Sequence, residues 1–113
     1  MAYRARRGDI IWLSLNPQAG HEQAGRRPAL VVSNDTFNDF TGSGAMVCPI
    51  SNTDRNSALH VPLDGRTLTS GVVMCDRAKI LDIGSRNAEF IEAAPEDVVF
   101  EAVDIVAGII EYE

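Results

Sequence analysis

Residues 21–28, with the sequence HEQAGRRP, bring an imidazole, a carboxylate, an amide and two guanidinium groups into one short segment. Gly20 and Gly25 bracket the polar residues and allow the chain to bend so that several side chains converge. These groups suit RNA cleavage by the 2′-hydroxyl, in which a base removes the hydroxyl proton, a cation stabilises the phosphorane and an acid protonates the leaving 5′-oxygen. Glu22, Arg27 and His21 are the candidates for these three roles.

Two other interpretations of the segment stay open at this point. Glu22 and an arginine would form a solvated surface ion pair worth about 0–1 kcal/mol, with His21 merely exposed. A histidine followed by a glutamate is also typical of metal motifs, but the only other histidine, His60, is not at helical spacing from the first. We therefore expect no metal site and no cofactor.

The composition indicates one compact domain over 1–113, since the chain has 113 residues and 45% of them are hydrophobic. No apolar run approaches the roughly 18 residues that cross a bilayer, and no apolar segment follows the basic start to form a secretion signal. We expect a cytoplasmic protein with no membrane contact. Cys48 and Cys75 lack metal-binding neighbours and are expected to be buried free thiols.

The net charge of −6 argues against a nucleic-acid partner, because phosphate binding usually requires a basic surface. The charges are segregated, however: residues 1–30 hold five arginines and two acids, whereas residues 87–113 hold eight acids and neither lysine nor arginine. We expect the leader arginines Arg4, Arg6 and Arg7 to lie near the 21–28 segment and to strengthen its attraction for phosphate.

The elements that must position these residues are mostly short strands, which predicts a mainly-β (α+β) fold. Closure of a small sheet into a barrel would remove its edges, and Pro49 and Pro62 are expected at edges or bulges. The apolar residues of the last helix cover more than one stripe, so we expect part of it to pack on a second copy of the chain. The predicted strands span 9–15, 28–33, 45–50, 58–63 and 71–81, and the predicted helices span 34–40 and about 95–111.

A series of short motifs along the chain closely resembles the MazF/PemK (Kid, ChpB-like) family of toxin endoribonucleases. The resemblance covers nearly the whole chain. The matching residues are Gly8 to Trp12, Asn16-Pro17, Gly20 to Gly25, Arg27 to Ser33, Val47 to Ser51, Val61 to Leu63, and Gly71 to Val73 with Asp76.

The resemblance implies a small SH3-like β-barrel with a short helix after strand 2, a C-terminal amphipathic helix and assembly as a homodimer. It also implies sequence-specific cleavage of single-stranded RNA without metal or ribosome, leaving a 2′,3′-cyclic phosphate and a 5′-hydroxyl, and thereby stopping translation and growth. The partner it implies is a MazE-like antitoxin of a type II toxin–antitoxin system, with an acidic flexible tail. Operator DNA would be bound only through the antitoxin complex.

By resemblance, Arg27 matches the arginine used at the scissile phosphate, as phosphorane stabiliser and candidate acid, and Glu22 matches the loop carboxylate expected to be the base. Ser51 keeps the hydroxyl of a threonine common in relatives and is the expected phosphate ligand, while His21 is a further acid candidate. Met74 replaces an arginine that the PemK/Kid branch places two residues before its catalytic aspartate, so the pattern favours Arg27. The residues expected to contact RNA are Gln23, Arg26, Asn52, Asp76 and Arg77, the last standing where relatives commonly have glutamine.

The rival class is a non-enzymatic toxin, because the gyrase-binding toxin CcdB has the same fold and fold does not fix function. Such a binder has no need for a carboxylate, a guanidinium and a hydroxyl at one phosphate, and gyrase poisoning would depend on the C-terminal end, here IIEYE. An inactive relative kept for regulation is a third alternative. Measured cleavage of RNA separates all three.

Overall fold

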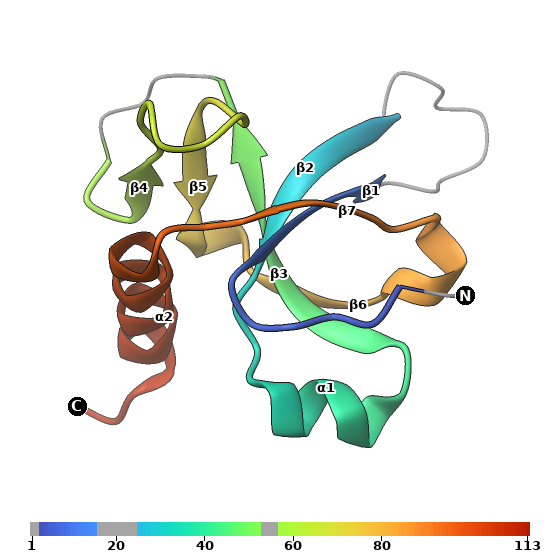
Figure 1. The fold of residues 1–113 in the computed structure, drawn as a ribbon. Helices are drawn as coiled ribbons and strands as arrows, with labels where there is room; N and C mark the ends of the chain where they lie inside the picture. The colour runs from blue at the N-terminus through green and yellow to red at the C-terminus, as the bar shows by residue number, and fades with distance from the viewer. Residues whose placement is uncertain (1–2, 16–24, 53–56) are drawn as a thin grey trace.

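The fold is built on one bent antiparallel sheet (Figure 1). A computed structural model describes residues 3–15, 25–52 and 57–113, and these residues form seven strands and two α-helices. The strand order is β4-β5-β3-β2-β1-β7, and β6 pairs with β3 beside this path. The elements are β1 Asp9–Ser14, β2 Arg26–Val31, α1 Asp35–Thr41, β3 Gly44–Ser51, β4 His60–Pro62, β5 Val72–Met74, η2 Cys75–Arg77, β6 Lys79–Asp82, η3 Ile83–Arg86, β7 Glu89–Ala93 and α2 Glu96–Ile110, where η marks a 3-10 helix.

β3 is the strand at which the sheet changes direction. Its residues 44–47 pair with β6, and its residues 50–51 pair with β5. Pro49 lies between these two pairings, where neither β5 nor β6 needs its missing N–H. The expectation of an edge or bulge is therefore wrong for Pro49, which lies in a central strand, but Pro62 does lie in β4 at the end of the strand order.

The mainly-β class with two helices is confirmed, whereas the closed barrel is wrong for the described strands. β4 and β7 stand at opposite ends of the strand order, and no ladder joins them in the part of the chain that the structure describes. The open end at β4 is covered by α2, which packs against β4 and η2 (Figure 1). A packed helix thus shields an edge that barrel closure would have removed.

Two regions of secondary structure differ from the sequence prediction. The predicted strand over 71–81 is divided into β5 and β6 by η2, because the two pieces pair with different parts of β3. β7 is not predicted at all, since Glu89–Ala93 mixes acidic and apolar residues without a clear period. Its pairing with β1, from the other end of the chain, is what makes it a strand.

Both predicted helices are present. α1 begins after Asn34, whose side chain accepts a hydrogen bond from the Phe37 N–H at 2.8 Å. α2 turns Val98 and Ala102 into the core between helix and sheet. Cys48 and Cys75 lie in the same core as buried free thiols, as predicted. None of the described helices is long and apolar enough to cross a membrane.

Candidate functional site

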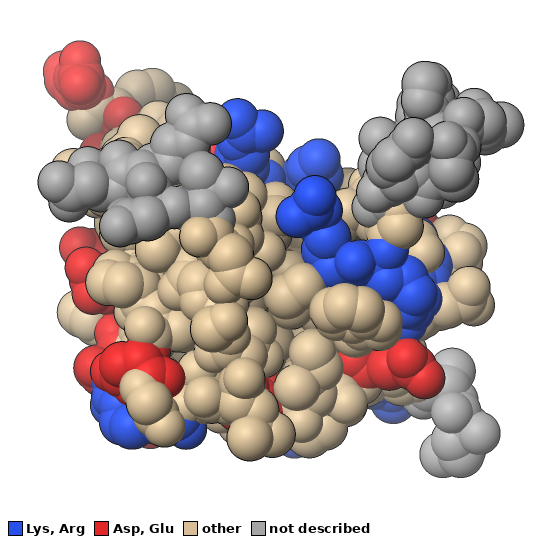
Figure 2. Space-filling model, turned by 90° about the horizontal axis from the view of Figure 1, so that it is seen from above, with Lys and Arg blue, Asp and Glu red and all other residues tan. Residues whose placement is uncertain are grey.

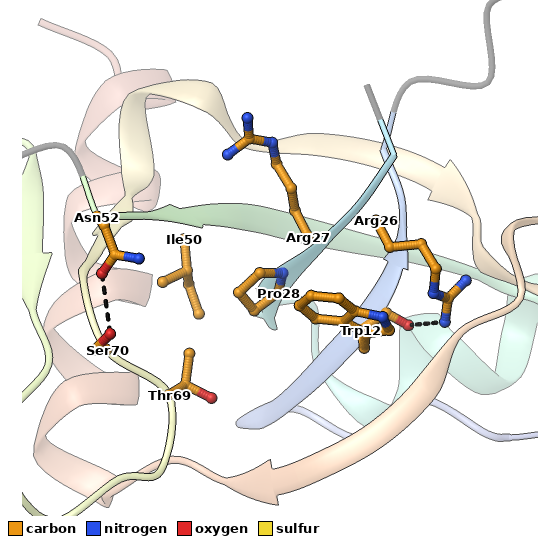
Figure 3. A pocket seen from close by; sticks show the side chains of 8 residues that line it. All are labelled: Trp12, Arg26, Arg27, Pro28, Ile50, Asn52, Thr69 and Ser70. Atoms are coloured by element: carbon orange, nitrogen blue, oxygen red, sulfur yellow. Dashed lines mark hydrogen bonds between the residues drawn. The ribbon is translucent and has the colours of Figure 1, made fainter. Parts of the chain in front are cut away.

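Positive charge gathers on one face of the molecule, seen from above in Figure 2. Lysine and arginine side chains cluster in the middle of this face, and the acidic side chains lie towards its margins. Arg26 and Arg27, at the start of β2, line a pocket of about 310 Å³ (Figure 3). The remaining lining residues come from β1, β2, the end of β3 and the loop before β5: Trp12, Pro28, Ile50, Asn52, Thr69 and Ser70.

Arg27 is the exposed cation of this pocket. Among the described residues, no hydrogen bond or ion pair engages its guanidinium. Figure 3 shows the side chain extending away from β2 beside the pocket, with its guanidinium unattached to the other residues drawn. An exposed guanidinium with its donors unused is suited to bind a phosphate in a bidentate way.

Arg26, the preceding residue, has the opposite arrangement. Its guanidinium donates to the carbonyl oxygens of Trp12 at 3.1 Å and Asn87 at 2.6 Å. It also forms an ion pair with Glu89 at 3.0 Å. These contacts join β1, β2 and the start of β7, so Arg26 supports the floor of the pocket on the side of Trp12.

Polar groups form the opposite rim. The Ser70 hydroxyl donates to Asn52 Oδ1 at 3.0 Å, and Figure 3 shows the amide nitrogen of Asn52 turned towards the pocket. Ser51, the predicted phosphate ligand, is the last residue of β3 and directly precedes Asn52, but it is not itself a lining residue. The rim therefore presents hydrogen-bond donors across the pocket from Trp12.

Comparison with known proteins gives this pocket its context. The profile of the PemK-like, MazF-like toxins of type II toxin–antitoxin systems matches residues 6–109. The chain belongs to this family. Its similarity to endoribonuclease PemK of Escherichia coli is 37% identity over 107 residues, covering 92% of this chain and 80% of PemK.

Two further relatives agree with that assignment to the PemK/MazF family. The endoribonuclease toxin ChpB of Escherichia coli strain K12 is 36% identical to this chain over 112 residues. The matched region covers 93% of this chain and 93% of ChpB. A crystal structure of the MazE–MazF complex of Deinococcus radiodurans is similar with a TM-score of 0.84 and 39% identity, over 95% of this chain and 96% of that one.

Two residues singled out by the family resemblance lie apart from the pocket. Asp76 and Arg77 belong to η2, which follows β5, whereas the pocket residue Ser70 precedes that strand. Asp76 Oδ1 lies 3.2 Å from Nε2 of His60, a residue paired with Met74 across β4 and β5. Neither Asp76 nor Arg77 lines the pocket of this PemK/MazF toxin.

His21, Glu22 and Gln23 lie outside the described residues, so their predicted roles stay predictions. Arg4 and Arg7 are described, and for these two residues the expectation of a place beside Arg26 and Arg27 is wrong. Arg4 pairs with Asp39 of α1 at 3.4 Å, and the Arg7 backbone N–H donates to Asp35 at the start of α1. The leader therefore lies along α1, at the other end of the sheet from the start of β2 (Figure 1).

Sequence reasoning did not place Trp12, Pro28, Thr69 or Ser70 in the site. Trp12 had a usable signal, because a strand that is otherwise buried from Asp9 to Leu13 carries one large aromatic side chain with 37% of its surface exposed. No feature of the sequence marks Thr69 and Ser70 as site residues, because threonine and serine are common in loops. Only the fold brings them to the pocket.

Proposed function

We propose that this chain is the toxin of a type II toxin–antitoxin system, and that it cleaves single-stranded RNA at the pocket beside Arg27. The observation that carries the proposal is the exposed Arg27 guanidinium, which has no protein partner within the described residues and lies beside a pocket with polar and aromatic walls. Membership of a family whose named relatives are endoribonucleases supports it. The cut would arrest translation by destroying messages.

The reaction we propose uses the RNA's own 2′-hydroxyl as nucleophile. Glu22 takes the hydroxyl proton, and the oxygen attacks the adjacent phosphorus to form a phosphorane whose charge Arg27 stabilises. The bond to the 5′-oxygen then breaks, and Arg27 or His21 supplies the proton that this oxygen needs. The products are a 2′,3′-cyclic phosphate and a 5′-hydroxyl, with no metal, cofactor or ribosome required.

Neighbouring residues would hold the substrate in register. Ser51 contributes a hydroxyl to a phosphate oxygen, and Asn52 and Gln23 donate to base edges. Trp12 offers an exposed aromatic ring on which an unpaired base can stack, an interaction worth about 1–3 kcal/mol. Sequence preference for a short motif follows from these contacts.

Residues outside the pocket would act on flanking nucleotides. Asp76 and Arg77 are exposed on η2, within one strand of the pocket, and suit sugar or base contacts. Arg26 adds positive charge, although its guanidinium is already engaged by the protein.

The partners we propose are a second copy of the chain and a cognate MazE-like antitoxin in the cytoplasm. Phe100, Ile109 and Ile110 of α2 are more than half exposed, which supports a helix with more apolar surface than its own core buries. An acidic antitoxin tail would be attracted to the face on which lysine and arginine side chains gather, and over the pocket beside Arg27 it would compete with RNA. Operator DNA would be bound only through that complex.

The direct test is to incubate the purified protein with a long unstructured RNA in EDTA and to sequence the new ends. We expect cuts at a short recurring motif, with 5′-hydroxyl ends and cyclic phosphates. Full-length RNA after incubation, or cleavage that EDTA abolishes, would contradict the proposal. Gyrase inhibition without RNA cleavage would instead favour a CcdB-like binder.

A further inference from the structure

Glu92 of β7 spans the gap left by the open sheet. Its Oε1 accepts the Leu68 N–H at 3.0 Å, and its Oε2 accepts both the N–H and the hydroxyl of Thr69 at 2.8 Å. Leu68 and Thr69 belong to the β4–β5 loop, residues 63–71, which leads into β5 near the other end of the strand order. One carboxylate thus receives the backbone N–H groups that a strand pairing would otherwise satisfy.

The carboxylate of Glu92 is ionised when it makes these contacts. Burial would raise the pKa of Glu92, but hydrogen bonds from the Leu68 and Thr69 N–H groups and from the Thr69 hydroxyl outweigh it and hold the pKa below its ordinary value. Accepting from all three donors favours the ionised carboxylate, because a proton on either oxygen would weaken it as an acceptor. At neutral pH the loop is therefore held by a full negative charge.

The held segment continues directly into the pocket. Thr69 and Ser70 line it, and the Ser70 hydroxyl donates to Asn52 Oδ1. Gly71 follows at a φ of +120°, and a Cβ there would lie 2.4 Å from the Ser51 carbonyl oxygen. Only a glycine lets the loop pass so close to the end of β3, and this approach keeps Ser70 beside Asn52.

We propose that Glu92 is a positioning residue for RNA recognition, acting through Thr69 and Ser70 on the amide of Asn52. With Oδ1 occupied by the Ser70 hydroxyl, Asn52 offers its Nδ2 hydrogens to the pocket (Figure 3). The amide therefore selects a nucleotide that places an acceptor there, a base carbonyl or ring nitrogen. This inference rests on the proposed RNA cleavage.

The test is a double-mutant cycle on kcat/KM for an RNA oligonucleotide that carries the cleaved motif. Glu92→Gln keeps the shape of the side chain but sets an NH2 group against a donor, and we expect it to lower kcat/KM about tenfold, mainly through KM. Asn52→Ala should lower it similarly. In the Asn52→Ala protein, the further change Glu92→Gln should alter kcat/KM by less than about twofold, because the group through which Glu92 acts is gone.

Asp97→Asn is the matched control. Asp97 of α2 holds the same loop by an ion pair with Arg66 at 2.9 Å, at a point away from the pocket. Its loss should leave kcat/KM within about twofold of wild type. Ser70→Ala tests the same proposal if the Glu92→Gln protein does not fold. We expect it to lower kcat/KM about threefold, and to have no further effect in the Asn52→Ala protein.

The side-chain amide signals of Asn52 in a 15N-correlation spectrum give a readout that does not need catalysis. We expect them to move in Glu92→Gln and in Ser70→Ala, and to stay in place in Asp97→Asn. Unchanged kcat/KM in Glu92→Gln, or a full tenfold loss that persists in the Asn52→Ala protein, overturns the role of Glu92. A wild-type protein that does not cleave RNA overturns the proposed function itself.

Discussion

Polar groups lie near both ends of β5, but those before the strand line a pocket and those after it bond to one another. Before the strand, Ser70 and Asn52 form a rim that faces the exposed guanidinium of Arg27. After it, Asp76 is hydrogen-bonded to His60, whose side chain is 9% exposed. The first region combines an unengaged guanidinium with a cavity. In the second, Asp76 is engaged by Nε2 of His60, and Nδ1 of His60 is the one buried side-chain polar atom without a partner among the described residues. Binding of a phosphate should therefore be sought in the first region.

The same contrast separates the neighbouring residues Arg26 and Arg27. Both residues belong to β2. Arg26 joins β1, β2 and β7, whereas Arg27 extends into solvent beside the pocket. Removing the first should chiefly affect the free energy of unfolding, and removing the second should chiefly affect catalysis. Substitutions at these and the neighbouring positions test that division of roles.

Arg27→Ala should lower the cleavage rate by at least about 100-fold, because the phosphorane loses its main electrostatic stabiliser. Arg27→Lys should recover only part of it, since an ammonium lacks the planar pair of donors. Single-turnover cleavage measures the effect. Arg4→Ala, which removes a cation beside α1, is the control and should cleave like wild type. A folded Arg27→Ala protein with near-normal cleavage would exclude Arg27 from the mechanism.

Arg26→Ala should lower the free energy of unfolding by about 2 kcal/mol, because the carbonyl oxygens of Trp12 and Asn87 lose a charged donor. The ion pair with Glu89 adds little to this value, since Glu89 is largely exposed and solvent screens it. Urea denaturation gives the measurement. Glu89→Gln should therefore cost less than about 1 kcal/mol, and an equal loss in both variants would show that the ion pair, not the carbonyl contacts, carries the stability.

Ser51→Ala should reduce cleavage about tenfold, less than Arg27→Ala, because it removes one hydrogen bond from an uncharged donor to phosphate, whereas Arg27→Ala removes a full positive charge. Ser51→Thr keeps the hydroxyl and should be nearly neutral. Rates for the two variants on one oligonucleotide decide the matter. Equal losses in both would mean that the space around Ser51, rather than its hydroxyl, is what matters.

Asp76→Asn should have the smallest effect, within about threefold in cleavage rate. The residue lies beyond β5 from the pocket, and the amide still offers an oxygen to His60. A loss of 100-fold or more would move the centre of catalysis to the η2 end of the strand and remove the contrast between the two regions.

The sequence was sufficient for the fold class, both helices and most strands, because these depend on local periodicity and capping. β7 could not be predicted, since Glu89–Ala93 becomes a strand only by pairing with β1. The open sheet could not be predicted either. Whether β4 pairs with β7 depends on the three-dimensional course of β3 and on where α2 packs.

Within the site, the sequence singled out Arg26, Arg27 and Asn52 but not what surrounds them. Residue type cannot tell Arg26 from Arg27, because the acceptors that engage Arg26 come from β1 and the start of β7. Glu92 likewise resembles any acidic residue of the C-terminal segment until the β4–β5 loop is placed beside it. These distinctions arise from tertiary contacts that no local pattern encodes.

The central claim is that RNA binds with its scissile phosphate at Arg27. The most direct measurement is a titration of 15N-labelled protein with an RNA oligonucleotide carrying 2′-deoxyribose at the cleaved position, which prevents attack. The indole N–H of Trp12, the only tryptophan of the chain, identifies the pocket without ambiguity. We expect large shifts for this signal and for Arg27 Nε–H, with small shifts at His60. Large shifts at His60 and Asp76, with the Trp12 signal unmoved, would contradict it.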